Sequence, residues 1–514
     1  MSTQIAKRAG LLWLCGLILM PVASPLNAQS PPPKIAQPEP DFSTARKLIR
    51  DRMAVESMPS FSVAVAQRGK ILWLESFGWS DRENKVPATP HTPYYLASVT
   101  KTITATAIML LYERRQLNID SPINTYLRSA RLTSPLWKVD EATVRRVATH
   151  TGGLTTFVQN RFGAPRNFSF PQDRIIQRYG IVFWPPGDHF DYSNLGYGIL
   201  GEVVGRVSGK SYGAFLRDEI FRPLEMSDSS LEVPYANEKN AARRYDSMFG
   251  PRSGVVSGTP GASTAYSSAE DLLKFGIFHL KSHRPRQKRV LADKTIDEMQ
   301  NATVAVGDGG RYGIGWWIKE DLYGYRGALA QGGTNDGSAS LQLIPSEGIV
   351  VVALANTGTT LPGDFIHEVL SILLPTYRER RAKDLLRTAQ QSPKPTPAPA
   401  MVGNWSGLIR TFNGDVPLSL YISESGDVKA HLGNEAPTSV SNVSFDKESL
   451  FGRISGKLPI EEDAGLDPYD FDFELYLRGS ALNGSVTTRP HPGAKNFTRL
   501  PFWVEFKKSQ PGKP

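Results

Sequence analysis

The sequence predicts an α/β domain of the α+β type, in which helices flank an antiparallel sheet, followed by a small all-β domain. Three observations carry this prediction. Strand-like segments lie near both ends of residues 41–388, helix-like segments fill the middle of that region, and apolar residues alternate with period two after residue 400. Between the two regions, residues 389–400 include the stretch QSPKPTPAPA, which is typical of a stiff, extended linker.

The first 28 residues have the pattern of a secretion signal. Lys7 and Arg8 precede an apolar run, and the small residue Ala28 ends the segment. The run, residues 11–24, is shorter than the ~20 apolar residues that cross a bilayer. We therefore expect cleavage, no stable membrane span, and a periplasmic or secreted protein that begins with a flexible leader, residues 29–40. The single cysteine, Cys15, lies inside the signal, so the mature chain has no thiol.

The charge balance gives no indication of a nucleic-acid partner. The net charge of +9 falls to +7 without Lys7 and Arg8 and is spread over a long chain. The one dense basic run, residues 283–289, contains no aromatic side chains that could stack on bases. We interpret this run as a solvated surface turn.

The large domain is expected to build its sheet from both ends of its own sequence. Gly- and Pro-containing turns separate its apolar strands, and helices from the middle are expected to pack on the sheet. In chain order we expect a helix over 43–55, strands over 62–67 and 71–77, mixed helices and loops over 100–282, a hairpin of 338–344 and 349–355, and a helix over 362–374.

The small domain, residues 401–505, is expected to be an antiparallel sandwich or barrel, followed by a tail over 506–514. Leu418, Leu420 and Ile422 share one strand face, and the apolar positions of 471–477 share another. No helix-like segment separates these strands. The small domain contains no motif that indicates chemistry.

Ser98 and Lys101 form an S-x-x-K pattern. A helix places residues three apart on one face, so the amine of Lys101 can take the proton of the Ser98 hydroxyl. Chance predicts on the order of two such matches in a chain of this length, and a second one does occur, Ser444 to Lys447. Only Ser98 precedes a long apolar helical run, residues 102–116. The alternative is a core helix in which Ser98 is merely the N-cap.

A second pattern, Y-x-N, occurs at Tyr192 and Asn194. The same pattern recurs at 235–237, where the charged and Pro-containing flanks indicate an exposed loop. Around these motifs lie the phrases LASVTKTITATAIMLLYERRQLNIDSPINTYL, ATHTGGL and PPGDHFDYSNLGYGILGEVVGRVSGKSY. In these phrases the chain resembles the serine β-lactamase and penicillin-binding protein family, in particular the group of class C β-lactamases, D-peptidases and family VIII esterases. The resemblance covers residues 45–372.

The resemblance implies a serine β-lactamase/transpeptidase-like fold and a role for each motif. Ser98 would form the acyl-enzyme, and Lys101 and Tyr192 would share the base and acid roles. Asn194 would bind the amide of the acyl side chain, and the backbone N–H groups of Ser98 and Thr334 would form the oxyanion hole. The small domain resembles the lipocalin-like β domains that follow some of these hydrolases.

This chain departs from the third motif of the family, which is Lys, His or Trp followed by any residue and then Gly. Gln331-Gly332-Gly333-Thr334 occupies its place, and we expect Gln331, Gly333 and Thr334 to contact substrate. Gln331 carries no charge, so the usual attraction for a substrate carboxylate is absent or comes from elsewhere. Literal matches at 150–152, 405–407 and 491–493 lie in the wrong places.

Two further patterns have simpler explanations. The G-x-G-x-x-G sequence at 196–201 follows no apolar strand, so the glycines indicate close helix packing rather than nucleotide binding. His279 and His283 are four residues apart but lack the H-E-x-x-H context of a zinc site, and we expect a polar helix end there. No cofactor and no metal is expected.

Together these motifs predict hydrolysis of an amide or ester bond through a Ser98 acyl-enzyme. The substrate would be a small molecule or peptide, with peptidoglycan fragments among the candidates. Esterase, D-peptidase and β-lactamase activities all stay open, because a fold does not assign a substrate. The alternative is a catalytically weakened protein that binds or senses penicillin or peptidoglycan, which Gln331 favours.

Overall fold

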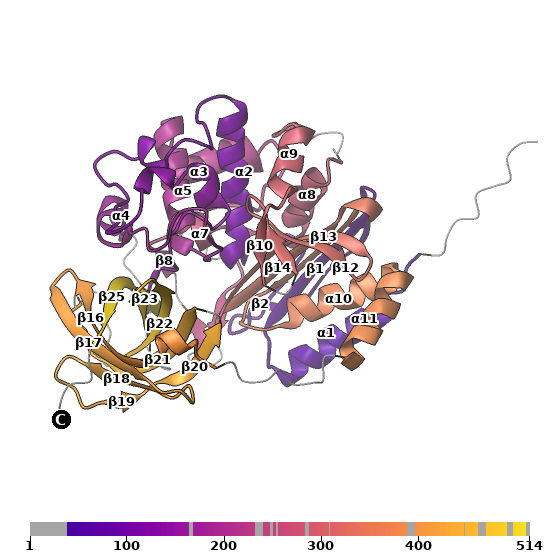
Figure 1. Cartoon of the computed structure of the whole chain (residues 1–514). Helices are drawn as coiled ribbons and strands as arrows, with labels where there is room; N and C mark the ends of the chain where they lie inside the picture. The colour runs from indigo at the N-terminus through magenta and orange to yellow at the C-terminus, as the bar shows by residue number, and fades with distance from the viewer. Residues whose placement is uncertain are drawn as a thin grey trace, which may run out of the picture. The chain divides into compact units, whose positions relative to one another are not determined.

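In the computed structural model, a nine-stranded sheet forms the centre of the large domain (Figure 1). Its order is β10-β11-β12-β13-β14-β15-β1-β2-β3, and every neighbouring pair is antiparallel. The strands are β1 (Ser60–Gln67), β2 (Lys70–Asp81), β3 (Val86–Pro87), β10 (Val304–Val306), β11 (Gly310–Tyr312), β12 (Trp317–Leu322), β13 (Tyr325–Thr334), β14 (Gly337–Ile344) and β15 (Ile349–Ala355). The pairing of β1 with β15 confirms that both ends of the domain contribute to one sheet.

The structure describes residues 39–163, 168–231, 240–246, 250–252, 255–282, 287–307, 309–387, 396–446, 448–460, 469–490 and 497–509. The expected secretion signal, nearly all of the expected leader and most of the expected linker lie outside these residues. None of the helices within the described ranges is long and apolar enough to cross a membrane.

Helices cover both faces of this sheet, and the alternation of side chains along the strands decides which core each residue joins. Val63 and Val65 pack under α1 (Ser43–Val55) and α10 (Leu361–Leu373), and α11 (Pro375–Arg387) follows on the same side (Figure 1). Ala64 and Ala66 point to the opposite face, which is covered by α8 (Ala269–His279). The bounds of α1 confirm the predicted helix over 43–55.

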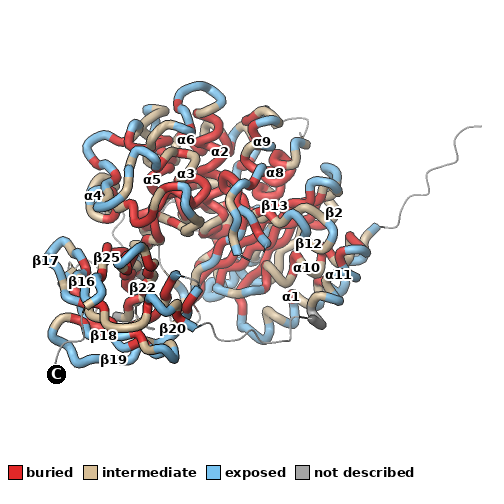
Figure 2. The backbone as a smooth tube through the Cα atoms, in the orientation of Figure 1, coloured by how far each residue is buried: buried red, intermediate tan, exposed pale blue. Residues whose placement is uncertain are grey.

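The helical half of the domain is built around α2 (Thr100–Glu113), which is buried from Thr100 to Leu111 (Figure 2). The other helices are α3 (Val144–Ala148), α4 (Gln172–Tyr179), α5 (Asn194–Ser208), α6 (Tyr212–Leu216), α7 (Pro260–Ser263) and α9 (Asp293–Gln300). A Cβ at Gly201 of α5 would lie 3.1 Å from the Cα of Gly261 in α7. The glycines of the 196–201 motif therefore serve helix packing, as predicted.

A second nine-stranded antiparallel sheet forms the C-terminal domain, in the order β19-β18-β17-β16-β25-β23-β22-β21-β20. Its strands are β16 (Gly403–Thr411), β17 (Gly414–Ile422), β18 (Val428–Leu432), β19 (Thr438–Ser439), β20 (Ser441–Asp446), β21 (Ser449–Gly456), β22 (Tyr469–Arg478), β23 (Ala481–Arg489) and β25 (Pro501–Lys508). The predicted apolar faces of residues 418–422 and 471–477 are buried. This barrel-like sheet confirms the all-β prediction.

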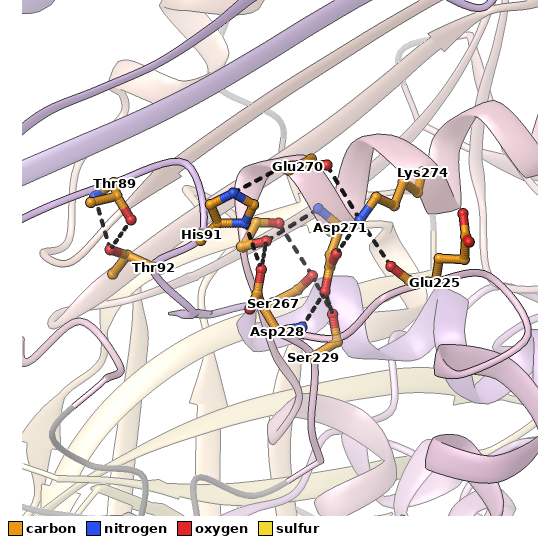
Figure 3. Close-up of polar contacts among 11 residues, drawn as sticks. Thr89, His91, Thr92, Glu225, Asp228, Ser229, Ser267, Glu270, Asp271 and Lys274 are labelled. Carbon is orange, nitrogen blue, oxygen red and sulfur yellow. Dashed lines mark hydrogen bonds and ion pairs between the residues drawn. The ribbon is translucent and has the colours of Figure 1, made fainter. Parts of the chain in front are cut away.

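The buried carboxylate of Asp271 in α8 binds the loop before Leu231 through hydrogen bonds. Asp271, whose side chain is 0% exposed, accepts hydrogen bonds from the backbone of Asp228 (2.7 Å) and the hydroxyl of Ser229 (3.0 Å), and it pairs with Lys274 at 2.9 Å (Figure 3). His91 contacts Asp228 at 3.0 Å, while the Ser229 hydroxyl contacts Asp271 instead. The serine and the histidine therefore do not form a relay, and the cluster is structural.

Candidate active site

Ser98 lies in a sharp turn that leads into α2. β4 (Tyr94–Tyr95) ends one residue before a 3₁₀ turn over Ala97–Val99, and α2 begins at Thr100. Ala97 is buried in the left-handed conformation, with φ +45°, which costs a residue with a side chain roughly 1 to 2 kcal/mol. Neither the 3₁₀ turn nor α2, both described in full, has a side-chain cap. The hydroxyl of Ser98 is therefore not used as an N-cap.

Lys101 is the polar centre of the site and is 1% exposed. Its Nζ lies 3.0 Å from Ser98 Oγ, 2.7 Å from Asn194 Oδ1 and 3.0 Å from the carbonyl oxygen of Ala262. Burial holds the pKa of Lys101 well below its usual range. A neutral amine has two N–H groups for Asn194 and Ala262, and its lone pair then faces the Ser98 hydroxyl.

Tyr192 covers the amine of Lys101. The Lys101 Nζ lies 4.7 Å from the centroid of the Tyr192 ring. Burial raises the pKa of Tyr192 to about 12, although a hydrogen bond with Ser98 lowers it in part. The phenol therefore keeps its proton at neutral pH and can donate it.

Sequence reasoning missed His150, which lies behind Tyr192. The two ring centroids are 4.4 Å apart, and the backbone N–H of Ser193 donates to His150 Nδ1 at 3.0 Å. Burial, helped by the nearby Lys101, keeps the pKa of His150 well below its usual range. The imidazole is neutral with its proton on Nε2, and it fixes the backbone of the Y-x-N motif. Its place in the phrase ATHTGGL was the only available signal.

The strand β13 approaches Ser98 through Gly332. A Cβ at this position would lie 2.3 Å from the carbonyl oxygen of Leu96 and 2.5 Å from the backbone nitrogen of Ser98. Residues 331–334 pair with β14 on one side, whereas β12 pairs with β13 only as far as Leu329. Within the described strands, the edge of β13 beside Ser98 is therefore free to pair with a substrate.

The three residues predicted from the third motif, Gln331, Gly333 and Thr334, lie on this edge but differ in their contacts. Gln331 and Gly333 alternate with Gly332 and so point to the opposite face of the sheet. The Gln331 amide nitrogen lies 4.0 Å from the Cβ position of Gly363 in α10. Thr334 donates its hydroxyl to Asp336 at 2.8 Å. The side chain of Gln331 therefore lies on the α10 side of the cavity over Ser98 and not beside the Ser98 hydroxyl.

Arg244, which lies near the end of the third motif, is already paired. Arg244 contacts Asp336 at 2.7 Å, and both side chains are buried. The Arg244 guanidinium also lies 3.8 Å from the centroid of the Tyr95 ring. Because Asp336 neutralises it, this arginine does not replace the charge that Gln331 lacks.

A cavity of about 330 Å³ opens over Ser98. The ring of Trp317 stacks near that of Tyr192, with centroids 6.1 Å apart and planes 17° from parallel. None of the described residues that line the cavity carries a charge: they are Ser98, Tyr192, Trp317, Gln331, Gly332, Gly333, Ser338, Ala339, Ser340, Thr359 and Pro362. The cavity can therefore hold a neutral group against an aromatic wall.

The competing serine Ser444 lies away from this site. Ser444 lies in β20 of the C-terminal sheet, and Lys447, His283 and residues 235–237 lie outside the described residues. The expectation of a polar helix end was wrong for His279, which is buried against Trp316 and bonds Thr106 at 3.1 Å. In the described part of the chain, no group of three His, Cys, Asp or Glu residues is placed to hold a metal ion.

Comparisons with known proteins agree with this geometry. The model of the Beta-lactamase family matches residues 45–372, which is more than half of the chain. Protein flp of Staphylococcus aureus (strain N315) is 24% identical over 319 residues, which are 60% of this chain and 62% of that protein. The match thus spans less than two thirds of the length of this relative.

Solved structures share the fold. The octameric penicillin-binding protein homologue from Pyrococcus abyssi superposes with a TM-score of 0.56 at 19% identity, over 90% of this chain and 100% of that one. A class C β-lactamase from Rhodobacter sphaeroides superposes with a TM-score of 0.52 at 22% identity, over 66% of this chain and 99% of that one. At these identities the likeness shows the fold alone.

Proposed function

The chain belongs to the β-lactamase family, and from this premise we propose that it is a serine hydrolase in which Ser98 is acylated by an amide or ester substrate. The observation that carries the proposal is the contact of 3.0 Å between Lys101 Nζ and Ser98 Oγ. A buried, neutral amine at this distance can accept the hydroxyl proton when the oxygen attacks a carbonyl carbon.

The proposed reaction has two halves. The Ser98 oxygen bonds to the carbonyl carbon, and the tetrahedral intermediate collapses when Tyr192 gives its proton to the leaving alcohol or amine. Lys101, protonated in the first step, then gives its proton to the Tyr192 oxygen, so that both groups return to their starting states. In the second half, water loses a proton to the same pair and attacks the ester, which releases the acid and restores Ser98.

The carbonyl oxygen needs hydrogen-bond donors as it becomes negative. The backbone N–H of Ser98 is one proposed donor, and the free edge of β13 at Thr334 supplies the other. Gly332 supports this role because it lets the strand approach the turn at Ser98. The substrate would lie between this edge and the ring of Trp317.

The substrate class follows from the uncharged cavity. A neutral ester or amide can enter without leaving an unpaired charge, whereas a carboxylate would meet no cation among the described lining residues. We therefore expect small neutral esters and amides to react better than penicillins or cephalosporins that carry a carboxylate.

The direct test is intact mass of the protein after reaction with a fluorophosphonate, followed by peptide mapping. We expect one adduct on Ser98 in the wild type and none in Ser98→Ala. An adduct on another serine would contradict the assignment. Stable acylation by the probe without turnover of any ester, anilide or cephalosporin would favour the alternative of a binding or sensing protein.

We also propose that the chain is exported and cleaved after Ala28. The support is the sequence of residues 1–28, with its basic start and apolar run. N-terminal sequencing of the protein from a periplasmic or secreted fraction should begin at Gln29. Recovery of the uncleaved chain from the cytoplasm alone would contradict this proposal.

A further inference from the structure

The segment that leads into Tyr192 is held by side chains of the C-terminal domain. Trp184, 1% exposed, donates its Nε1–H to Asp191 at 2.7 Å, and its ring lies 4.8 Å from that of Tyr476 on β22. The Tyr476 hydroxyl donates to Glu474 at 2.9 Å. Asp191 and Glu474 are close enough for the charge of Glu474 to raise the pKa of Asp191.

We call Trp184, Asp191, Glu474 and Tyr476 the Trp184 cluster. Further contacts surround it. The ring of His189 stacks on Tyr476 with centroids 5.1 Å apart and planes at 29°. A Cβ at Gly484 of β23 would lie only 2.9 Å from the Trp184 ring. The two domains are therefore packed without space between them at this point.

A second contact reaches the other side of Lys101. β24 (Phe497–Arg499) pairs with β5 (Val158–Phe162) of the large domain, and β5 pairs with β8 (Val255–Ser257). Two residues separate β8 from α7, and the Ala262 carbonyl of α7 accepts a hydrogen bond from Lys101 at 3.0 Å. The C-terminal domain thus contacts the segment before Tyr192 directly and is linked to α7 through the pairing of β5 with β8.

We infer that the C-terminal β domain is a working part of the active site, in which Glu474 and Tyr476 are positioning residues that hold Tyr192 against Lys101 through Trp184 and Asp191. This inference rests on the proposed acylation of Ser98. Asp191 is bonded directly to Tyr192 in the chain, so a shift of its side chain and backbone moves the phenol. A misplacement of about 1 Å at reacting groups can cost ~100-fold in rate.

The two carboxyl groups make this connection sensitive to pH. Burial and the charge of Glu474 raise the pKa of Asp191 to about 8, and burial raises the pKa of Glu474. The other ionisable groups that face them are His189, Tyr476 and the ion pair between Asp188 and Arg478 at 3.2 Å.

The sign of the effect follows from the raised pKa. In the unfolded chain, a carboxyl ionises near pH 4. In the folded protein, Asp191 keeps its proton up to about pH 8. Because the unfolded chain already loses this proton near pH 4, the free energy of unfolding falls as the pH rises from about 4 to about 8. Above pH 8, the carboxylates of Asp191 and Glu474 repel each other. We therefore expect Ser98 labelling to slow on the alkaline side.

The first experiment removes the aromatic contact. In Tyr476→Ala we expect the fluorophosphonate rate constant at Ser98 to fall about tenfold, and amide exchange in peptides of 183–197 to become faster. Tyr421→Ala is the matched control, because Tyr421 is an exposed tyrosine of the same sheet. Equal labelling and equal exchange in Tyr476→Ala and wild type would overturn the inference.

The second experiment removes the repulsion. Glu474→Gln should keep its labelling rate at pH values where the wild-type rate falls. The matched control is Asp470→Asn, which should lose labelling at these pH values like the wild type. Asp470 is on the same sheet but accepts a hydrogen bond from the Ser455 hydroxyl at 2.6 Å. An unchanged alkaline limb in Glu474→Gln would overturn the inference. If Tyr476→Ala does not fold, Tyr476→Phe and Glu474→Gln still test it. A wild type that is not labelled at Ser98 contradicts the proposed function, while amide exchange still tests the contact.

Discussion

Replacement of Gly332 by alanine should slow acylation strongly without removing any functional group. The strand β13 contributes only backbone at this position, and the added methyl group would point at the turn that carries Ser98. The variant therefore tests whether the close approach of β13 to the nucleophile is needed for the reaction.

The expected magnitude comes from two distances. The new Cβ would lie 2.3 Å from the Leu96 oxygen and 2.5 Å from the Ser98 nitrogen, whereas real Cβ atoms essentially never approach closer than 3.0 Å. Strand and turn must separate by about 0.7 Å at the tighter contact. A misplacement of about 1 Å can cost ~100-fold in rate, so we expect labelling of Ser98 to slow by about 30-fold or more.

The assay is the second-order rate constant for fluorophosphonate labelling, read as intact mass against time. Circular dichroism melting checks that the variant folds. The matched control is Gly337→Ala on β14, where the nearest atom to the new Cβ would be 3.4 Å away, an ordinary contact. A folded Gly332→Ala protein that is labelled within twofold of the wild-type rate would refute the reasoning.

Four further predictions concern the amine of Lys101, its pH dependence, the third motif and the buried carboxylate of Asp271. Lys101→Ala should slow labelling of Ser98 by ~100-fold or more because the proton acceptor is gone; near-normal labelling would mean that another base operates. In the wild type, burial lowers the pKa of Lys101, so on the acid side the labelling rate should fall only at pH values where the amine gains a proton. Gln331→Lys should raise kcat/KM for a carboxylate-bearing cephalosporin, relative to a p-nitrophenyl ester, by up to about tenfold; efficient turnover by wild type, unchanged in the variant, would show that another cation serves. Asp271→Ala should lower the free energy of unfolding by about 3 kcal/mol or more, because it leaves Lys274 without its buried partner, while Glu270→Gln at the rim should change it little; equal urea midpoints for both variants would contradict this account.

The contact between Ser98 and Lys101 and the fold could be predicted because their signals are local or periodic. Ser98 and Lys101 are three residues apart, so helix geometry alone places them together. The hairpin of β14 and β15 was expected within one residue at its ends, because apolar strands flank a turn that ends at Gly348 with φ +63°. Period-two alternation likewise identified both faces of the C-terminal strands.

Other features of the site depend on distances between segments far apart in the sequence. His150 matched the third motif literally, yet it lies behind Tyr192 and accepts a backbone hydrogen bond there. Gln331 occupies the third motif, but the alternation of β13 directs its side chain toward α10. Neither placement follows from spacing, because both depend on which face of an element packs against which neighbour.

The sequence by itself determined the helix that carries Lys101 and begins beside Ser98, the Y-x-N motif and the two-domain order, since each depends on residues close together in the chain or on a short period. Tertiary structure alone decided the pKa of the Lys101 amine and the surroundings of Tyr192. Folding removes water from Lys101 and so lowers its pKa, and a sequence motif does not specify how deeply a side chain is buried. The contact of Tyr476 with Trp184 joins residues almost three hundred positions apart, and only the packing of the two domains brings them together.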